Sequence, residues 1–431
     1  MSALASCAQT PLVEHAARNR NPGAVVWRYA LSSAGPVCIS AAHFIAAFLF
    51  LHAFARTDFG LFSFLLVIVP FCLSIAGAMI GAPVAVAFRH ASVNPSELST
   101  YLKTNLAFAS VAGMAVCVLM RSSGAGWPLA VLSGAYGAMM TLRWFARTLT
   151  YARGPAVRVL VSDILYSATL VAGLLLQRHF NRLTPLSAAA ILFGSCFIAW
   201  FGFGWAYLRE QIAAAVTGSL AGYARIWNDF ARWSALGVVL TEFTVNAHAY
   251  LVTFIAGPAA FAPLAIGTLL MRPAQLVLTA IPDRERPSMA RLLGSGNYAG
   301  ARRSVNHFRI AAGAVWLVTA TTATALLLWL PQFVLRKGYD PTQALVVLGF
   351  LAAITAVRAF RTPEAVLLQA AGQFRALAFV CLWSSIASLG ATLALLLFAG
   401  PVFSLAGIAA GEIVVAVQIR MAVNTWMRSR A

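Results

Sequence analysis

Three polar side chains lie close together in an otherwise apolar stretch, LTEFTVNAHAYLVTFIAG, at residues 240–257. Glu242, Asn246 and His248 fall within seven positions, and the first two are one helical turn apart. In a helix this spacing places the carboxyl and the amide on one face. A desolvated carboxyl can exchange a proton near neutral pH, which suits ion- or proton-coupled transport. The alternative is a structural role, in which an arginine or hydrogen bonds hold Glu242 permanently.

Several arginines could bind an anionic group, because the planar guanidinium grips phosphate oxygens bidentately. A charge inside a membrane costs about 2.5–3.5 kcal/mol on insertion scales, so it should face a cavity or a partner. The alternative to substrate binding is that these arginines lie near a membrane surface and reach the lipid head groups. The candidates for binding an anionic substrate are Arg272, which precedes Pro273, Arg143 with Arg147, Arg358 with Arg361, and Arg28.

Two further polar residues, His43 and Asp163, complete the candidate set. We expect His43 to be a core histidine rather than a ligand, and Asp163 to lie near the end of a span. Five of the six cysteines lie in apolar runs without metal-ligand spacing, so they are interpreted as small buried hydrophobes. We therefore expect no metal site and no cofactor.

The elements that must position these residues are membrane-spanning helices. Hydrophobic residues make up 61% of the 431-residue chain and charged residues only 10%, and the mean hydropathy is +0.80. A soluble domain is about a quarter charged. Apolar runs of the length needed to cross a bilayer recur along the whole chain. We predict an all-α membrane protein with twelve spans, near 29–54, 60–88, 104–120, 127–146, 157–177, 186–207, 233–256, 259–281, 309–335, 342–360, 376–399 and 401–421.

The orientation follows from the lysines and arginines in alternate connections. With the N-terminus inside, 24 of them fall on the cytoplasmic side and six on the other, while Arg272 stays within a span. Both termini should therefore be cytoplasmic. The net charge of +19 is then mainly a topology signal that favours anionic lipids, and nucleic acid is not an expected partner.

The two halves of the chain repeat short features in the same order. Ala-His recurs in the first and seventh spans at His43 and His248, and an arginine pair ends the fourth and tenth spans. Two halves of six spans share one orientation, related by a pseudo-twofold axis along the membrane normal. The expected divisions are a cytoplasmic tail (1–28), a six-helix bundle (29–207), a linker that could be an amphipathic surface helix (208–232), a second bundle (233–421) and a cytoplasmic tail (422–431).

Two segments resemble the Wzx-type polysaccharide flippases. FARTDFGLFSFLLVIVPFCLSIAGAMIGAPVAV (54–86) is similar to their break after the first span and their glycine-rich second span. IAGPAAFAPLAIGTLLMRPAQLVLTAIPDRERPSMARLLGSGNYAGARR (255–303) resembles their seventh-to-ninth span region. The resemblance implies the multidrug/oligosaccharidyl-lipid/polysaccharide exporter superfamily, with two bundles forming a V around a central cavity. It also implies a bacterial inner-membrane protein that flips polyprenyl-diphosphate-linked oligosaccharide to the outer leaflet.

Two other functions remain open at this point: a cation-coupled multidrug efflux pump of the same superfamily, and a membrane glycan polymerase or ligase. Efflux pumps usually place acids in the cavity, whereas this chain has more intramembrane arginine. A polymerase would need a long non-cytoplasmic loop, and those connections span only about three to eleven residues. We therefore expect a non-enzymatic, monomeric transporter whose partners are its lipid-linked cargo, membrane lipids, and candidate polymerase and export machinery.

Overall fold

A computed structural model describes residues 22–87, 94–153, 156–336 and 338–428. Most of the predicted tail 1–28 and the last three residues of the tail 422–431 lie outside the described residues. The helices of the first half are α2 (Pro22–Ala53), α3 (Arg56–Ala76), η1 (Gly77–Gly81), α4 (Ala82–Ala87), α5 (Pro95–Ser122), α6 (Trp127–Arg153), α7 (Ala156–His179), α8 (Pro185–Trp200) and η2 (Phe201–Phe203).

The second half begins with short connecting helices and continues with long ones. The connection comprises α9 (Trp205–Thr217), α10 (Tyr223–Ile226) and η3 (Trp227–Ala231). The long helices and their breaks are α11 (Arg232–Leu251), η4 (Val252–Ala256), α12 (Pro258–Leu270), α13 (Arg272–Gly294), α14 (Tyr298–Trp329), α15 (Pro331–Val334), α16 (Pro341–Ala370), α17 (Phe374–Ala399) and α18 (Ser404–Arg428). The described residues contain no strand, which confirms the all-α prediction.

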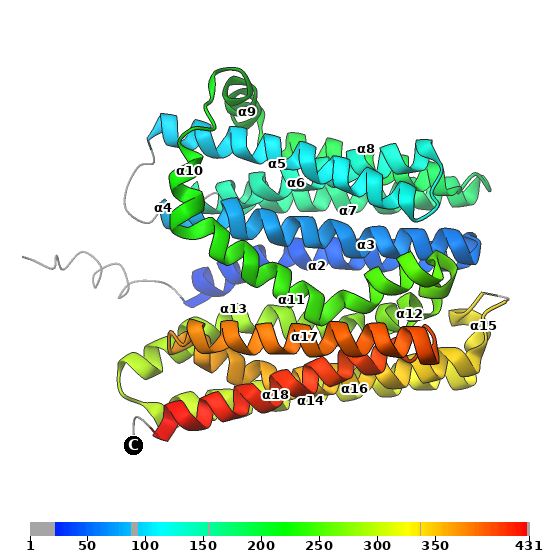
Figure 1. Cartoon of the computed structure of the whole chain (residues 1–431). Helices are drawn as coiled ribbons and strands as arrows, with labels where there is room; N and C mark the ends of the chain where they lie inside the picture. Colours follow the sequence, from blue (N-terminus) through cyan, green and yellow to red (C-terminus); the bar gives the residue numbers. More distant parts are fainter. Residues whose placement is uncertain (1–21, 88–93, 154–155, 337, 429–431) are drawn as a thin grey trace, which may run out of the picture.

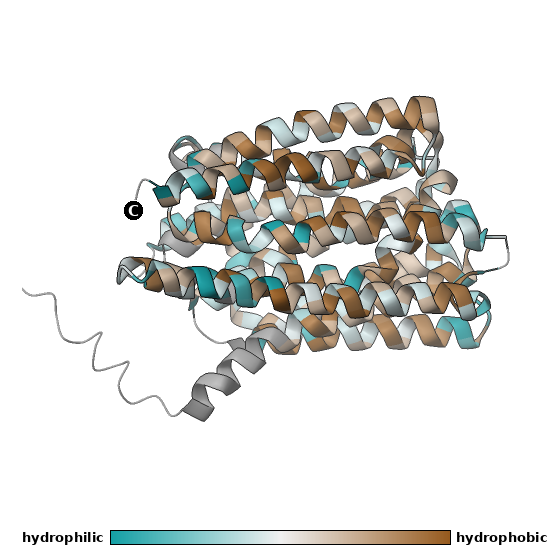
Figure 2. Cartoon of the chain, turned by 90° about the horizontal axis from the view of Figure 1, so that it is seen from below, coloured by the Kyte–Doolittle hydropathy of each residue, from teal (hydrophilic) through white to brown (hydrophobic). Residues whose placement is uncertain are grey.

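Each of the twelve predicted spans coincides with a helical segment. Ten are long and apolar enough to cross a membrane, and the bent pair α12 and α13 would make an eleventh. The remaining segment, α6, is less apolar because glycines, polar residues and Arg143 interrupt its hydrophobic run. Hydrophilic residues gather mainly towards the two ends of the long helices, as Figure 2 shows. The chain is thus a multi-pass membrane protein.

The same pairs of helices pack against one another in both halves. In the first half α2 packs on α7, α5 on α6, and α8 on both α6 and α7. In the second half the corresponding pairs are α11 on α17, α14 on α16, and α18 on both α16 and α17. The helices form two groups, the N-terminal bundle (α2–α8) and the C-terminal bundle (α11–α18), seen above and below in Figure 1. This repeated packing supports the internal repeat predicted from the sequence.

The eighth span is broken rather than continuous. Its two parts, α12 and α13, meet at Met271 with a bend of 59°. Pro273 explains the break, because a proline lacks the backbone N–H and its ring crowds the carbonyl four residues earlier. The residue before it, Arg272, is the first residue of α13. The sequence predicts Arg272 inside the eighth span, and the structure places it at the bend of that span.

The two bundles meet closely at the end expected to be non-cytoplasmic. Helix α3 packs along α12 there, and a Cβ atom on Gly60 would overlap the backbone carbonyl of Pro258. Arg56 donates through Nε to the carbonyl of Ala259, 3.0 Å away. Arg336, two residues after the end of α15, donates to the carbonyl of Phe54. These contacts, called the outer seal below, join the bundles at one end of the molecule.

Candidate functional site

A cavity of about 510 Å³ lies between the two bundles. Helix α3 of the N-terminal bundle forms one wall, and α11, α12, α13 and α16 of the C-terminal bundle form the others. Its lining combines apolar side chains with hydroxyl and amide groups. The charged or titratable residues that line it are Glu242, His248, Arg272, Arg358 and Arg361. Six of the residues predicted from the sequence are therefore brought together, namely these five and Asn246.

Hydrogen bonds within its own helix hold Glu242. Its Oε1 atom accepts from Nδ2 of Asn246 at 3.0 Å and from the hydroxyl of Tyr250 at 2.7 Å. The three residues are spaced i, i+4 and i+8, so they follow one face of α11. No arginine makes an ion pair with Glu242 among the described residues. Of the two ways in which the structural role would hold Glu242, an arginine pair or hydrogen bonds, the structure contains the hydrogen bonds.

Arg272 projects into the cavity from the break in the eighth span. It lies about 20 Å along α12 from the non-cytoplasmic end, at 1.5 Å per residue, and so lies deep in the membrane. It has no acidic partner within the part of the chain that the structure describes. An uncompensated guanidinium therefore faces the space between the bundles.

The other two cavity arginines, Arg358 and Arg361, share one buried carboxyl. Each Nε atom lies 2.7 Å from a different oxygen of Glu412, which α18 contributes and which is fully buried. One negative charge between two positive charges leaves the group cationic. Glu412 is not among the candidate residues predicted from the sequence. Glu412 is an isolated acid in an apolar helix, and it lies in the same half of the chain as the pair Arg358 and Arg361. That combination could have identified it from the sequence.

His248 lies at the wall of the cavity and is 6% exposed. Its ring stands 6.3 Å from that of Phe261, and its Nδ1 atom has no hydrogen-bond partner among the described residues. Buried polar atoms are normally satisfied. A ligand or a water molecule in the cavity could supply this partner.

The structure keeps Arg143 and Asp163 away from the cavity. Arg143 Nη2 lies 2.5 Å from Oδ1 of Asp163, and Arg147 Nη2 lies 3.1 Å from Oδ2. Arg143 is 1% exposed, and it also bonds Ser162 and stacks over Tyr166. The predicted pair Arg143 and Arg147 thus contacts Asp163 and does not line the cavity, and an arginine buried at this depth needs such a counter-charge. Asp163 is that counter-charge, inside the N-terminal bundle.

His43 is a partly buried histidine of the N-terminal bundle, and it is hydrogen-bonded to a tyrosine. Its Nε2 atom lies 2.7 Å from the hydroxyl of Tyr166, which in turn lies 3.1 Å from that of Tyr136. Neither tyrosine was singled out from the sequence, because a tyrosine in an apolar run carries no pattern that reveals its partner. The side chain of Arg28 lies outside the described residues.

Solved structures share this fold, although no protein-family profile and no curated protein matches the sequence. An inward-facing multidrug resistance MATE family transporter of the MOP superfamily superposes with a TM-score of 0.70, 12% identity, and coverage of 91% of this chain and 96% of that chain. An outward-facing transporter of the same description superposes with a TM-score of 0.56 and 14% identity, and the match covers 91% of this chain and 94% of that chain. The lipid II flippase MurJ in an inward closed conformation superposes with a TM-score of 0.66 and 12% identity, and the match covers 91% of this chain and 87% of that chain. The chain has the fold of MOP-superfamily transporters, the superfamily that the resemblance implied.

Proposed function

We propose that the chain is an alternating-access transporter of a lipid-linked anion, and that its cargo is a polyprenyl-diphosphate-linked oligosaccharide. The observation that carries this proposal is Arg272, which faces the cavity without an acidic partner. An unpaired arginine at depth is costly to insert, so it is retained where an anionic group meets it. A diphosphate is such a group, and the guanidinium fork fits its oxygens.

The composition of the cavity favours the same class of cargo. Three arginines line it against one glutamate, and Glu412 behind them offsets only one positive charge. Its volume lies within the roughly 300–1,000 Å³ of small-molecule sites, which suits a head group while a lipid tail stays in the bilayer. The apolar wall from α3, which includes Leu66 and Val67, is compatible with a cargo that is partly lipid.

Two observations support alternating access. The outer seal joins the bundles at the end expected to be non-cytoplasmic. The fold also superposes better on an inward-facing MOP-superfamily transporter than on an outward-facing one. In the proposed cycle the seal opens and the opposite end closes, so that the arginines of the cavity face each leaflet in turn.

Transport of a fluorescent polyprenyl-diphosphate saccharide in proteoliposomes tests the proposal. We expect Arg272→Gln to lower the rate at least tenfold, and Arg272→Lys to retain part of it by keeping the charge without the fork. Arg291→Gln is the matched control, because it removes an equal charge from an exposed position on the same helix, α13. Removing an unpaired charge should not lower the melting temperature, which separates lost transport from unfolding.

If Arg272→Gln transports at the full wild-type rate, Arg272 does not bind the cargo. The efflux alternative predicts a different phenotype: deletion of the gene would cause drug sensitivity with normal surface glycan. The flippase predicts lost glycan and accumulated lipid-linked precursor. A polymerase or ligase predicts new glycosidic products when the pure protein is given precursor, which the flippase does not.

A further inference from the structure

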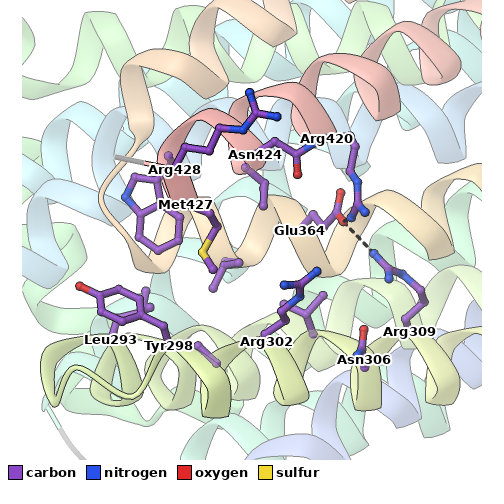
Figure 3. A pocket seen from close by; sticks show the side chains of 15 residues that line it. Leu293, Tyr298, Arg302, Asn306, Arg309, Glu364, Arg420, Asn424, Met427 and Arg428 are labelled. Atoms are coloured by element: carbon purple, nitrogen blue, oxygen red, sulfur yellow. Dashed lines mark hydrogen bonds and ion pairs between the residues drawn. The ribbon is translucent and has the colours of Figure 1, made fainter. Parts of the chain in front are cut away.

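A second cavity, of about 380 Å³, lies inside the C-terminal bundle and away from the space between the bundles. Figure 3 shows it between α14, α16 and α18, beside the turn that joins α13 to α14. The first turns of α14 and the last turns of α18 form it, so it lies at the end expected to be cytoplasmic. None of the residues predicted to act in transport lines it.

The cavity carries a strong excess of positive charge. Arg302, Arg309, Arg420 and Arg428 line it against a single acid, Glu364, so three positive charges are not neutralised. Arg302 and Arg428 have no acidic partner in the described ranges. Both side chains are exposed, so solvent or a ligand can reach them.

Glu364 positions the other two arginines. Its side chain is only 4% exposed, and its Oε1 atom accepts from Arg309 at 3.0 Å and from Arg420 (Figure 3). Arg309 is fixed further by Phe360, whose ring lies 4.3 Å from its guanidinium carbon and whose carbonyl accepts from Nε at 3.3 Å. Donors fixed in advance lose little conformational entropy when a ligand binds.

Neutral donors and an apolar wall complete the cavity. The amide groups of Asn306 and Asn424 lie among the arginines. Tyr298 and Trp426, with ring centroids 6.2 Å apart, lie at one end beside Met427. Guanidinium and amide donors match a phosphate group, and the aromatic and thioether side chains match the glycerol and first methylenes of a lipid.

The depth of the cavity also matches a phospholipid head group. Helix α14 has 32 residues and is therefore about 48 Å long, against about 30 Å for the hydrocarbon core. Its first turns, from Tyr298 to Arg309, extend into the head-group layer. An anionic leaflet attracts basic side chains at that level.

We propose that this cavity binds a phosphate group, supplied by the head group of an anionic phospholipid of the cytoplasmic leaflet. The four arginines and two asparagines surround the phosphate, and the Tyr298–Trp426 pair contacts the start of the lipid chain. The site is separate from the transport cavity, so this proposal stands whatever the transported cargo is.

Titration of the purified, delipidated full chain with phosphatidylglycerol, followed by native mass spectrometry, tests the proposal. Loss of one charge-assisted hydrogen bond should weaken binding about tenfold or more, so Arg302→Gln and Arg428→Gln should each have this effect. Arg303→Gln is the matched control: Arg303 is adjacent and exposed, but it does not line the cavity. Zwitterionic phosphatidylcholine should bind more weakly than phosphatidylglycerol to the wild type.

A competition experiment with soluble phosphates distinguishes a lipid head group from free phosphate as the ligand. Inorganic phosphate and glycerol 1-phosphate are added as competitors at millimolar concentration. Retention of the lipid identifies the head group as the ligand, whereas displacement that Arg302→Gln abolishes identifies free phosphate bound by the same arginines. If the wild type, Arg302→Gln and Arg303→Gln bind the lipid with equal affinity, the cavity is not the lipid-binding site.

Discussion

The guanidinium of Arg143 lies 2.5 Å from the carboxyl of Asp163, and neither side chain is more than 1% exposed. A second arginine, Arg147, contacts the same carboxyl. The arrangement recurs at Glu412, between Arg358 and Arg361, and at Glu364, between Arg309 and Arg420. One carboxyl between two arginines leaves each cluster with a net positive charge. The basic character of the chain therefore extends into its helical bundles and is not confined to its surfaces.

These clusters should be important for stability. Asp163→Asn and Glu412→Gln each leave two arginines without a buried counter-charge, and breaking a buried pair typically costs about 3–5 kcal/mol. We expect either change to lower the melting temperature in detergent markedly. Glu210→Gln is the control, because Glu210 pairs with Arg153 at an exposed position where such pairs contribute about 0–1 kcal/mol. Equal melting temperatures for all three variants would show that the clusters do not stabilise the fold.

The outer seal should depend on Gly60. A methyl group there would overlap the carbonyl of Pro258, so Gly60→Ala must separate α3 from α12. We expect the population to shift towards conformations open on the non-cytoplasmic side. A single cysteine at Ser63, which lines the cavity, should then react faster with a membrane-impermeant thiol reagent added from that side.

The control for the seal is Gly313→Ala on α14. A Cβ atom at that position has no neighbour within 4 Å, so the change adds a methyl group without a clash. It should leave the labelling rate at Ser63→Cys unchanged, in a background from which the native cysteines have been removed. Unchanged labelling in Gly60→Ala as well would mean that the contact between Gly60 and Pro258 does not limit opening.

Much of the fold could be predicted from the sequence, because apolar runs and their breaks report the spans directly. The twelve helical segments and the repeated halves follow from hydropathy and from short echoes such as the Ala-His pairs at His43 and His248. The bend at Arg272 was not predicted, although Pro273 was visible. A proline can be accommodated within a membrane helix or can break it, and the packing around it decides which occurs.

The site could be predicted only in part, because sequence shows which residues are polar and not which helices face one another. Arg272, Glu242 and His248 do meet in one cavity. Arg143 has the same residue type and a similar depth, yet it pairs with Asp163 inside a bundle. Its partner lies twenty positions away on the neighbouring helix, and no local pattern reveals such a contact.

The role of Glu242 can be tested by removing its ionisation while keeping its shape. Glu242→Gln retains a carbonyl oxygen that can accept from Tyr250 and Asn246, but it cannot release a proton. If Glu242 couples transport to protons, the variant should transport at a basal rate that an imposed proton gradient no longer accelerates. Tyr250→Phe keeps the carboxyl, so it should slow transport while preserving the response to the gradient.

Glu97→Gln supplies the matched control for this charge change. Glu97 is an exposed acid in the first turn of α5, and its side chain does not line the cavity between the bundles. Proteoliposomes containing each variant are compared with and without the gradient, at equal protein content. Gradient-stimulated transport by Glu242→Gln would assign Glu242 a structural role, in which its hydrogen bonds to Asn246 and Tyr250 shape the cavity wall. Loss of stimulation in this variant alone would identify the carboxyl on α11 as the coupling group, because only there does removing the proton site remove the response.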